Sequence, residues 1–403
     1  MSGIIIQKFG GTSVKNTERI FNVANIIAET YKKGYHVLAV VSAQGDHTDE
    51  LLAKANEINP KANLRSKDLL LSTGEATSAA LVAMALEKLG LPAVPLMGWQ
   101  CGVETDTHYG SAHIKKINTE RVLSEFAKGN IVVMAGFQGV NIFNDITTLG
   151  RGASDTSAVA MAAALKAEIC QIYTDVDGVF TTDPRIVPNA KKLDFITYDE
   201  MLELATLGAN VLHNRSVEIA KKYHIDLEVL SSITRKQGTI VQEIVSADRA
   251  PVRGVAKDED IARISIIGVP DRPGIAFKIF SKLSSRNINV DIILQSIGRN
   301  STKDISFTVA KSNLDTTFDL LKDYIVTIGA SDVVTDCNVA KVSIVGAGMK
   351  FQPGVASKMF ESLYQNDINI QMISTSEIKV TVLVDKEKAN LAVQTVHAAF
   401  FGE

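Results

Sequence analysis

A lysine and two glycines follow the first apolar run of the chain, in the segment 8–13 with the sequence KFGGTS. Glycines let the backbone approach a phosphate closely, and Thr or Ser can cap a following helix whose N–H groups attract an anion. A lysine beside such a loop supplies the positive charge that a transferred phosphoryl group needs. An ordinary turn between a strand and a helix would also explain the segment, so phosphate chemistry is one of two interpretations that it allows.

Two other loops have a similar character. The segment 147–155 (TTLGRGASD) is rich in glycine, opens a predicted helix and carries Arg151 and Asp155 at its mouth. The segment 173–185 (YTDVDGVFTTDPR) follows another predicted strand. Walker-type, dinucleotide-binding and H-E-x-x-H motifs are absent from the sequence. Three such loops exceed what structure alone requires, and together they favour a phosphate site of a less common type.

The elements that must position these loops alternate between short β-branched runs and helical patterns. We expect strands at residues 4–6, 37–41, 93–96, 131–135 and 169–174, and helices at 18–32, 69–88 and 157–165. This alternation predicts a mostly parallel sheet with helices on both faces. Ligands of such sheets bind at the carboxyl ends of the strands, which is where the three loops lie.

The pattern changes near residue 245, where a polar stretch indicates a domain boundary, and an internal repeat with an offset of 80 follows. Pro273–Ala276 corresponds to Pro353–Ala356, and 10 of 24 aligned positions are identical without a gap. Each copy predicts a small β-α-β-β-α unit. The second copy ends with a predicted helix at 386–400 and has no closing strand, so we expect the segment 252–256 to cross over and complete it.

Composition limits the class of protein. A chain of 403 residues corresponds to two to three domains at roughly 150 residues each. With 46% hydrophobic and 22% charged residues it can bury sizeable cores, and a net charge of −3 argues against a nucleic-acid partner. Three cysteines without a C-x-x-C spacing fit a reducing compartment, and no apolar run suggests a signal peptide or a membrane span. We therefore expect a soluble, cytoplasmic, multidomain protein.

Taken in order, these segments resemble those of the aspartokinases of the amino-acid kinase family. The resemblance includes residues 72–75 (STGE) and 211–213 (VLH), and the repeat is similar to a tandem pair of ACT domains, which sense small ligands. It implies a three-layer αβα sandwich with a mostly parallel sheet, followed by two ferredoxin-like βαββαβ ACT units. The implied boundaries are a catalytic domain at 1–245, a linker with the crossing strand at 246–262, and ACT units at 263–338 and 339–403.

The implied reaction is ATP-dependent phosphorylation of the β-carboxylate of L-aspartate to 4-phospho-L-aspartate, with Mg²⁺ carried by the nucleotide. This is the first step of lysine, threonine and methionine synthesis. A carboxylate is already ionised at neutral pH, so catalysis should rest on positive charge and backbone N–H groups rather than on a general base. The ACT pair implies feedback inhibition by lysine, threonine or both, and a homodimer or higher homo-oligomer formed through the ACT domains. Neither a nucleic acid nor a membrane is expected as a partner.

The resemblance also implies which residues of this sequence form the site, matched position by position within the motifs. The catalytic residues would be Lys8, which stabilises the transferring group, and Asp155, which orients Lys8 or the metal–phosphate cluster. The nucleotide would be held by Lys8, Gly10, Gly11, Ser13, Thr174, Asp175, Phe180 and Arg185. The aspartate would be held by Thr48, Glu75, Phe137, Arg151 and Ser154, of which Arg151 would bind the α-carboxylate and Glu75 the ammonium. The effector would contact Asp271, Gln295 and Asn369.

The sequence departs from the family pattern at three places, one of which is the loop 44–47 (QGDH), where a version containing methionine is commoner. Asn210 stands where related enzymes commonly have lysine, and Ala153 stands where glycine is more usual. Two alternatives stay open: a kinase of the same fold that acts on glutamate, acetylglutamate or a nucleoside monophosphate, and a catalytically silent amino-acid sensor. The KFGGTS opening and the ACT pair weigh against the first alternative. The presence of Lys8, Glu75, Arg151 and Asp155 weighs against the second.

Overall fold

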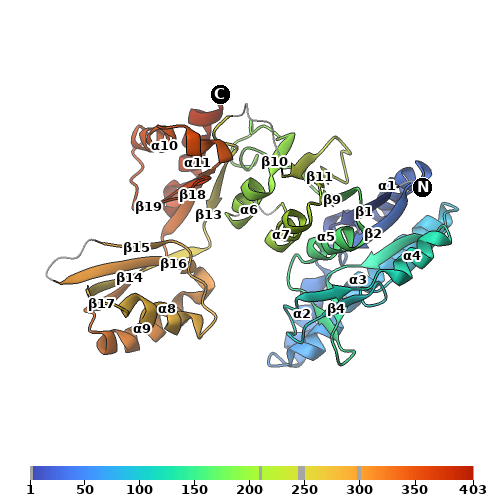
Figure 1. The fold of residues 1–403 in the computed structure, drawn as a ribbon, viewed down its shortest axis with the longest axis horizontal. Helices are drawn as coiled ribbons and strands as arrows, with labels where there is room; N and C mark the ends of the chain where they lie inside the picture. The colour runs from blue at the N-terminus through green and yellow to red at the C-terminus, as the bar shows by residue number, and fades with distance from the viewer. Residues whose placement is uncertain (1–2, 208–210, 244–249, 297–300, 403) are drawn as a thin grey trace. The chain divides into compact units, whose positions relative to one another are not determined.

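The computed structural model describes residues 3–207, 211–243, 250–296 and 301–402, which form two compact units (Figure 1). The first unit holds the described residues up to 180, from 191 to 206 and from 211 to 243. The second holds residues 181–190, residue 207 and the described residues from 250 onwards. The expected boundary at 245 and the departure at Asn210 lie outside the described residues.

The main sheet of the first unit has eight strands in the order β10-β12-β11-β9-β1-β2-β6-β3. Its central pairs β11–β9, β9–β1, β1–β2, β2–β6 and β6–β3 are parallel, whereas β11 and β12 are antiparallel. The strands are β1 (Ile4–Phe9), β2 (His36–Val41), β3 (Ala93–Leu96), β6 (Ile131–Ala135), β9 (Ile169–Thr174), β10 (Phe195–Thr197), β11 (Leu227–Ser231) and β12 (Thr239–Gln242). The mostly parallel α/β architecture expected from the sequence is therefore confirmed.

Helices cover both faces of this sheet. Helices α1 (Thr17–Lys32) and α3 (Leu64–Lys88) pack on one face, where they share a core with Phe9, Ala39 and Val133 of the strands. Because side chains alternate along a strand, Lys8 points to the opposite face, where α5 (Ser154–Leu165) contacts β1. Helix α7 (Asn214–Tyr223) packs against α5. The alternation of β1 thus directs the lysine of the glycine-rich segment towards the first turn of α5.

Helix α3 is long and apolar enough, by length and composition alone, to cross a membrane. More than half of its most apolar stretch is buried inside the fold, and Val82, Ala83 and Leu86 belong to the core between α1 and the sheet. The buried Asp68 and Glu75 lie on the same helix. These contacts are those of a core helix.

A second, four-stranded sheet completes the first unit, in the order β5-β4-β7-β8. The sequence did not predict it, because its strands are only three or four residues long and lack a clear alternation. The remaining elements of this unit are β4 (Val103–Thr105), β5 (Ile114–Ile117), β7 (Gln138–Val140), β8 (Ile146–Thr148), α2 (His47–Ile58), α4 (Glu120–Ala127) and α6 (Tyr198–Thr206).

The second unit contains two antiparallel four-stranded sheets, β15-β16-β14-β17 and β13-β18-β20-β19. Helices α8 and α9 lie against one face of the first sheet (Figure 1). The first copy comprises β14 (Ile261–Pro270), α8 (Ile275–Ser284), β15 (Ile293–Gln295), β16 (Thr302–Ala310), α9 (Leu314–Ile328) and β17 (Asp332–Asp336). The second comprises β18 (Val339–Val345), α10 (Val355–Tyr364), β19 (Met372–Thr375), β20 (Lys379–Asp385) and α11 (Ala389–Phe401). Helices α8 and α10 begin and end 80 residues apart, at the offset of the sequence repeat.

The two copies close their sheets differently. In the first, β17 follows α9 and pairs with β14. In the second, β13 (Gly254–Asp258), which precedes both copies in the chain, pairs antiparallel with β18, and Val255 lies opposite Ile344. The expected crossing strand is therefore part of the second sheet. The first copy is thus enclosed in sequence between two pieces of the second.

Residues 181–190 also pack with the second copy, although the boundary at 245 would have assigned them to the catalytic domain. The backbone N–H of Val255 donates to the carbonyl of Thr181 at 2.7 Å, and Val187 belongs to the core formed by α10, α11 and the second sheet. The amide of Gln394 donates to the carbonyl of Ile186 at 3.0 Å. The connection from β9 to β10 thus leaves the first unit and returns to it.

Candidate active site

The loops that follow β1 and β2 touch at the carboxyl edge of the main sheet. The backbone N–H of Gly45 donates to the carbonyl of Gly11 at 3.0 Å. A Cβ at Gly11 would lie 2.7 Å from the carbonyl oxygen of Ala43, so only glycine allows the two loops to meet. The loop after β6 begins at the same edge because β1, β2 and β6 are parallel. This edge is where a parallel sheet offers a ligand site.

An ion pair lies at this edge, between the two expected catalytic residues. Lys8 Nζ is 2.6 Å from Asp155 Oδ1, and the side chains are 12% and 9% exposed. Asp155 occupies the first turn of α5 and also accepts a hydrogen bond from the backbone N–H of His213 at 3.3 Å. A Cβ at Gly10 would lie 3.5 Å from Lys8 Nζ, so the ammonium group lies beside the glycine-rich loop.

A cavity of about 230 Å³ opens at the same edge. All five residues expected to hold the aspartate line it, and Gly11 of the glycine-rich loop lines it with them. These five residues come from α2, α3, the loop after β6, and the loop and first turn of α5. They are Thr48, Glu75, Phe137, Arg151 and Ser154. Side chains that are far apart in the sequence thus converge on one space.

Glu75 carries an uncompensated buried carboxylate in the wall of this cavity. Its Oε1 accepts a hydrogen bond from the backbone N–H of Ala43 at 3.2 Å, while its Oε2 has no hydrogen-bond partner among the described residues. The residue is 4% exposed. Burial raises the pKa of Glu75 to about 7, against the opposing effect of backbone hydrogen bonds. A cation bound in the cavity would supply the missing partner.

Arg151 and Phe137 lie at the mouth and in the wall of the cavity. The Arg151 guanidinium is 77% exposed and forms an ion pair with Asp49 of α2. Phe137 has a φ of 69°, a left-handed conformation that is costly for an aromatic residue. Its backbone N–H donates to Ser157 Oγ at 3.0 Å, and its carbonyl accepts from Leu149, which fixes the turn after β6. Ala153, buried in the cluster around Phe137, is accommodated there as an apolar methyl group.

The residues expected to hold the nucleotide, unlike those expected to hold aspartate, lie in several different parts of the fold. Thr174 and Asp175 lie at the end of β9, where Thr174 Oγ1 and Asp175 Oδ1 are 3.0 Å apart. The Ser13 hydroxyl is engaged with Ser232 Oγ at 2.7 Å. Phe180 forms an isolated bridge with Lys192. Arg185 belongs to the second unit and pairs with Asp183 at 2.7 Å.

The site includes residues that the sequence did not single out. The buried Asp68 of α3 accepts hydrogen bonds from Gly110 and Thr148, and Arg215 of α7 donates to the carbonyl of Leu149 at 2.9 Å. These contacts hold the loop that carries Arg151. His213, by contrast, belongs to the VLH segment that the resemblance includes; burial lowers the pKa of its imidazole, although Asp155 opposes the effect. Each contact joins residues far apart in the sequence, so local patterns could not have predicted them.

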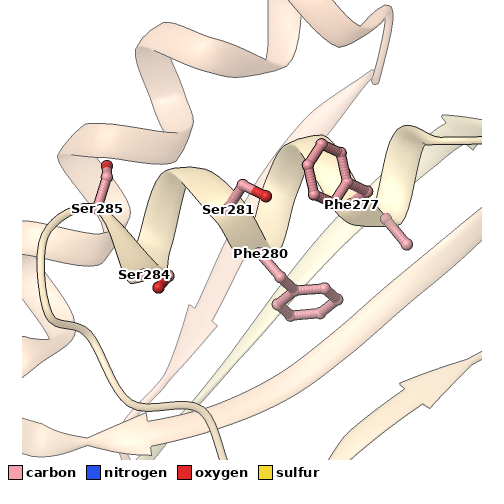
Figure 2. A pocket seen from close by; sticks show the side chains of 6 residues that line it. Phe277, Phe280, Ser281, Ser284 and Ser285 are labelled. Atoms are coloured by element: carbon pink, nitrogen blue, oxygen red, sulfur yellow. The ribbon is translucent and has the colours of Figure 1, made fainter.

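The expected effector residues of the second unit are all exposed. Asp271 forms an ion pair with Lys303 at 2.7 Å, Gln295 ends the edge strand β15, and Asn369 follows α10. None of the three lines the cavity of the first unit or the hollow along α8. This shallow hollow along α8 has a volume of about 590 Å³ (Figure 2). Its lining residues are Ala276, Phe277, Phe280, Ser281, Ser284 and Ser285.

Comparisons with known proteins agree with this architecture. Residues 3–231 match the amino acid kinase family, and residues 264–324 and 342–400 match the ACT domain. The chain is 49% identical over 399 residues to the aspartokinase of Bacillus sp. (strain MGA3), covering 99% of this chain and 97% of that protein. It is 48% identical over 402 residues to the aspartokinase of Helicobacter pylori (strain J99), covering 98% and 99%.

Solved structures give the same result. The structure of E. coli aspartokinase III in complex with aspartate and ADP matches with a TM-score of 0.84 and 26% identity, over 99% of this chain and all of that one. The structure of the same enzyme with lysine and aspartate matches with a TM-score of 0.75. The kinase domain, the two regulatory ACT domains and the identity along nearly the whole length identify an enzyme that uses ATP to phosphorylate aspartate. The chain belongs to the aspartokinase family.

Proposed function

We propose that the chain transfers the γ-phosphoryl group of ATP to the β-carboxylate of L-aspartate and forms 4-phospho-L-aspartate, the first step of lysine, threonine and methionine synthesis in the cytoplasm. The observation that supports this most directly is the cavity at the sheet edge, whose walls contain all five residues expected to hold aspartate. The E. coli relative was crystallised with aspartate and ADP, and its structure aligns over the whole chain.

The residues of the cavity suit the charges of aspartate. Glu75 would pair its free Oε2 with the substrate ammonium, and Arg151 would exchange Asp49 for the α-carboxylate, for which a guanidinium is suited. A β-carboxylate oxygen then attacks the γ-phosphorus. A new P–O bond forms, the bond to the β–γ bridging oxygen breaks, and ADP leaves with the electron pair. Because the attacking carboxylate is already ionised, no proton has to be removed.

Positive charge must offset the approach of two anions. Lys8 would contact the transferring group, and Asp155 would hold its ammonium in position through their 2.6 Å ion pair. Gly10 and Gly11 would admit the phosphates to the backbone, with Ser13, Thr174, Asp175 and Phe180 around the nucleotide. Asp155 and phosphate oxygens are ligands that suit Mg²⁺, which would neutralise the polyphosphate. Arg185 would approach the polyphosphate only if its pairing with Asp183 changed.

Hydroxamate formation in the presence of hydroxylamine tests this proposal, because hydroxylamine traps the acyl phosphate. Full-length chain with MgATP is expected to give hydroxamate from aspartate and not from glutamate, and Lys8→Ala should abolish it. Hydroxamate from glutamate alone, or ADP release driven by a nucleoside monophosphate, would indicate another kinase of the same fold. No product from any of these substrates, with the fold intact by circular dichroism, would indicate a silent amino-acid sensor.

We further propose that the ACT pair binds an end-product amino acid, lysine or threonine or both, and lowers the activity. Its sequence repeat builds two small antiparallel units, and E. coli aspartokinase III was crystallised with lysine. Asp271, Gln295 and Asn369 would contact the effector. Calorimetric titration of the full chain with each amino acid, alone and combined, should show saturable binding that Asp271→Ala or Asn369→Ala weakens and Asp319→Ala does not. Absence of heat with every combination would remove the feedback proposal.

Assembly into a homodimer through the ACT domains is a separate proposal. Phe277 is 75% exposed on α8, beside the hollow shown in Figure 2, and Ile293 is exposed on the edge strand β15. Contiguous exposed apolar surface marks association sites, and Phe277 is part of the lining of this hollow whereas Val326 is not. In sedimentation experiments Phe277→Asp should shift the chain towards the monomer, whereas Val326→Asp, similarly exposed on α9, should not. A monomeric wild-type chain would contradict the proposal.

A further inference from the structure

The loop between β4 and β5 gathers three groups that can bind a metal ion, namely Asp106, His108 and His113. Nδ1 of each histidine lies 3.1 Å from the same atom, Asp106 Oδ2. The other carboxylate oxygen accepts hydrogen bonds from the backbone N–H groups of His108 and His113, at 3.2 and 3.1 Å. The loop itself therefore holds the carboxylate in place, while both imidazole rings are exposed to solvent.

The loop is anchored to the rest of the unit. Asp68 accepts a hydrogen bond from the backbone N–H of Gly110 at 2.9 Å, and it accepts two from Thr148 at the end of β8. The backbone N–H of Ala112 donates to the carbonyl of Thr148 at 2.9 Å. Because Asp68 is almost fully buried, these bonds are shielded from water. The three candidate ligands are thus presented by a fixed loop rather than by a mobile one.

Two of the three ligand separations fit one shared ion, and all three ligand atoms lie within 4.8 Å of one another. Two ligands bound at about 2.0–2.1 Å, with angles between 90° and the tetrahedral value, lie roughly 2.9–3.4 Å apart. The 3.1 Å separations from Asp106 Oδ2 to both histidine nitrogens fall in this range. Two imidazoles and one carboxylate select a borderline transition-metal ion over Mg²⁺, which prefers oxygen ligands. We propose that Asp106, His108 and His113 form a binding site for a divalent transition-metal ion such as Zn²⁺.

A simpler account is that Asp106 only accepts two hydrogen bonds from exposed histidines. Exposed hydrogen bonds of this kind contribute little to stability because water competes for them, and each ring loses rotational freedom when it is held. Convergence of both Nδ1 atoms on one oxygen therefore gains little without an ion. With an ion, the same convergence becomes a preorganised set of three ligands, with further coordination positions open to water.

Arg215 connects this candidate metal site to the loop that carries Arg151, the residue proposed to bind the α-carboxylate of aspartate. Arg215 Nη2 lies 2.8 Å from His113 Nε2, and Nη1 donates to the carbonyl of Leu149 at 2.9 Å. Arginine is a donor only, so His113 Nε2 accepts and its single proton resides on Nδ1. A metal ion on Nδ1 moves that proton to Nε2, where it faces the Arg215 donor. The bond to Arg215 is then lost, and the loop that carries Arg151 loosens.

Calorimetric titration of the metal-free full-length chain with ZnCl₂ tests the site. One equivalent of Zn²⁺ should bind, and His108→Ala or His113→Ala should each weaken the affinity by at least about tenfold. His224→Ala is the matched control, because His224 is also exposed and pairs with a carboxylate, Glu243. Absence of saturable binding overturns the proposal. Equal affinity in the wild-type, His108→Ala and His113→Ala chains, or equal loss in His224→Ala, overturns it as well.

The link to Arg215 is tested by a second titration, with L-aspartate and without nucleotide, and this part rests on the proposed function. One equivalent of Zn²⁺ should weaken aspartate binding several-fold in the wild-type chain and leave it unchanged in His113→Ala. If Zn²⁺ binds but aspartate affinity stays constant, the link through Arg215 is wrong and the metal site stands. If aspartate does not bind to the metal-free chain, the proposed aspartate site fails, and the zinc titration still decides the metal site.

Discussion

The catalytic and regulatory units bury charge in different ways. In the catalytic unit Glu75 is buried with one carboxylate oxygen unpaired, at the wall of a cavity. In the regulatory unit Lys341 is equally buried, but it contacts Asp291 at 2.6 Å and Asp258 at 3.1 Å. An uncompensated buried charge costs free energy unless a ligand supplies the partner, whereas a fully paired one needs no ligand. The comparison supports the proposal that a small molecule binds beside Glu75, whereas the charge of Lys341 only stabilises the fold.

The largest effect is expected from Lys8→Ala, which removes the cation of the proposed transfer site. Since the lysine acts on the charge of the transferring group, kcat should fall by at least about 10³-fold with a smaller change in KM. Steady-state kinetics with MgATP and aspartate measure both constants, and Lys15→Ala, exposed in the same region, is the control. An unchanged kcat with a raised KM would show that Lys8 only binds the nucleotide.

Glu75→Gln tests the unpaired charge itself. If Glu75 binds the substrate ammonium, KM for aspartate should rise about 10- to 100-fold, as expected for loss of a charged hydrogen bond. In the wild type, KM should fall as the pH rises through about 7, because Glu75 gains its charge there. The variant should show no such fall. Kinetics between pH 6 and 8.5 decide the matter, and a pH-independent KM in the wild type would contradict the assignment.

Glu75→Gln should weaken aspartate binding but increase the stability of the folded chain. Because burial raises the pKa of Glu75 from 4.5 to about 7, the folded state prefers the neutral carboxyl group. The free energy of unfolding therefore decreases as the pH rises through this range. Glu75→Gln should remove that decrease and raise the thermal midpoint at pH 8, while it weakens aspartate binding. A variant that lost both stability and binding would indicate a purely structural role.

Much of the catalytic unit could be predicted because its signals are local. The runs at residues 37–41, 131–135 and 169–174 are strands within one residue of the expected bounds, since buried parallel strands are continuous apolar segments. Glu75, Arg151 and Ser154 were proposed as substrate residues through the resemblance of short motifs, which each span few positions. Their meeting in one cavity follows from the parallel order of β1, β2 and β6, which brings the loops to one edge.

The parts that could not be predicted depend on distant contacts. Asp68 and Thr148 are 80 positions apart, and Arg215 and Leu149 are 66 apart, so neither pair leaves a local pattern. Residues 181–190 look like a continuation of the loop after β9, yet Val187 packs with the second regulatory copy. In the regulatory unit the repeat predicted α8 and α10 well, but the effector residues were chosen by analogy, and all three are exposed.

Lys341→Met tests the paired charge of the regulatory unit. Burial alone would lower the pKa of Lys341, but its hydrogen bond to Asp291 and the charges of Asp291 and Asp258 raise it above the ordinary value. Removal of the lysine leaves two partly exposed carboxylates facing each other, which should cost about 1–3 kcal/mol. Hydrogen exchange of the β18 segment should accelerate, with Lys278→Met on α8 as an exposed control. Unchanged exchange would mean that the pair contributes nothing to the regulatory unit.

The smallest effects are expected from replacing glycines that have a positive φ but no atom close to the position that a Cβ would occupy. Gly274 and Gly354 cap α8 and α10 with φ of 86° and 93°, and Gly90 in the catalytic unit has a φ of 75°. A Cβ at any of the three would meet open space, so substitution by alanine adds conformational strain without a clash. Each should cost about 1 kcal/mol.

These three variants show whether the two units unfold independently. In scanning calorimetry Gly274→Ala and Gly354→Ala should lower the same transition by a similar amount, because the interleaved order of β13, β14 and β18 makes the two regulatory copies one cooperative body. Gly90→Ala should lower a different transition. If Gly274→Ala and Gly354→Ala shifted separate transitions, the copies would be independent domains despite the crossing strand. If all three variants shifted one transition, the catalytic and regulatory units would unfold together. The destabilisation caused by Lys341→Met would then also be felt at the proposed aspartate site.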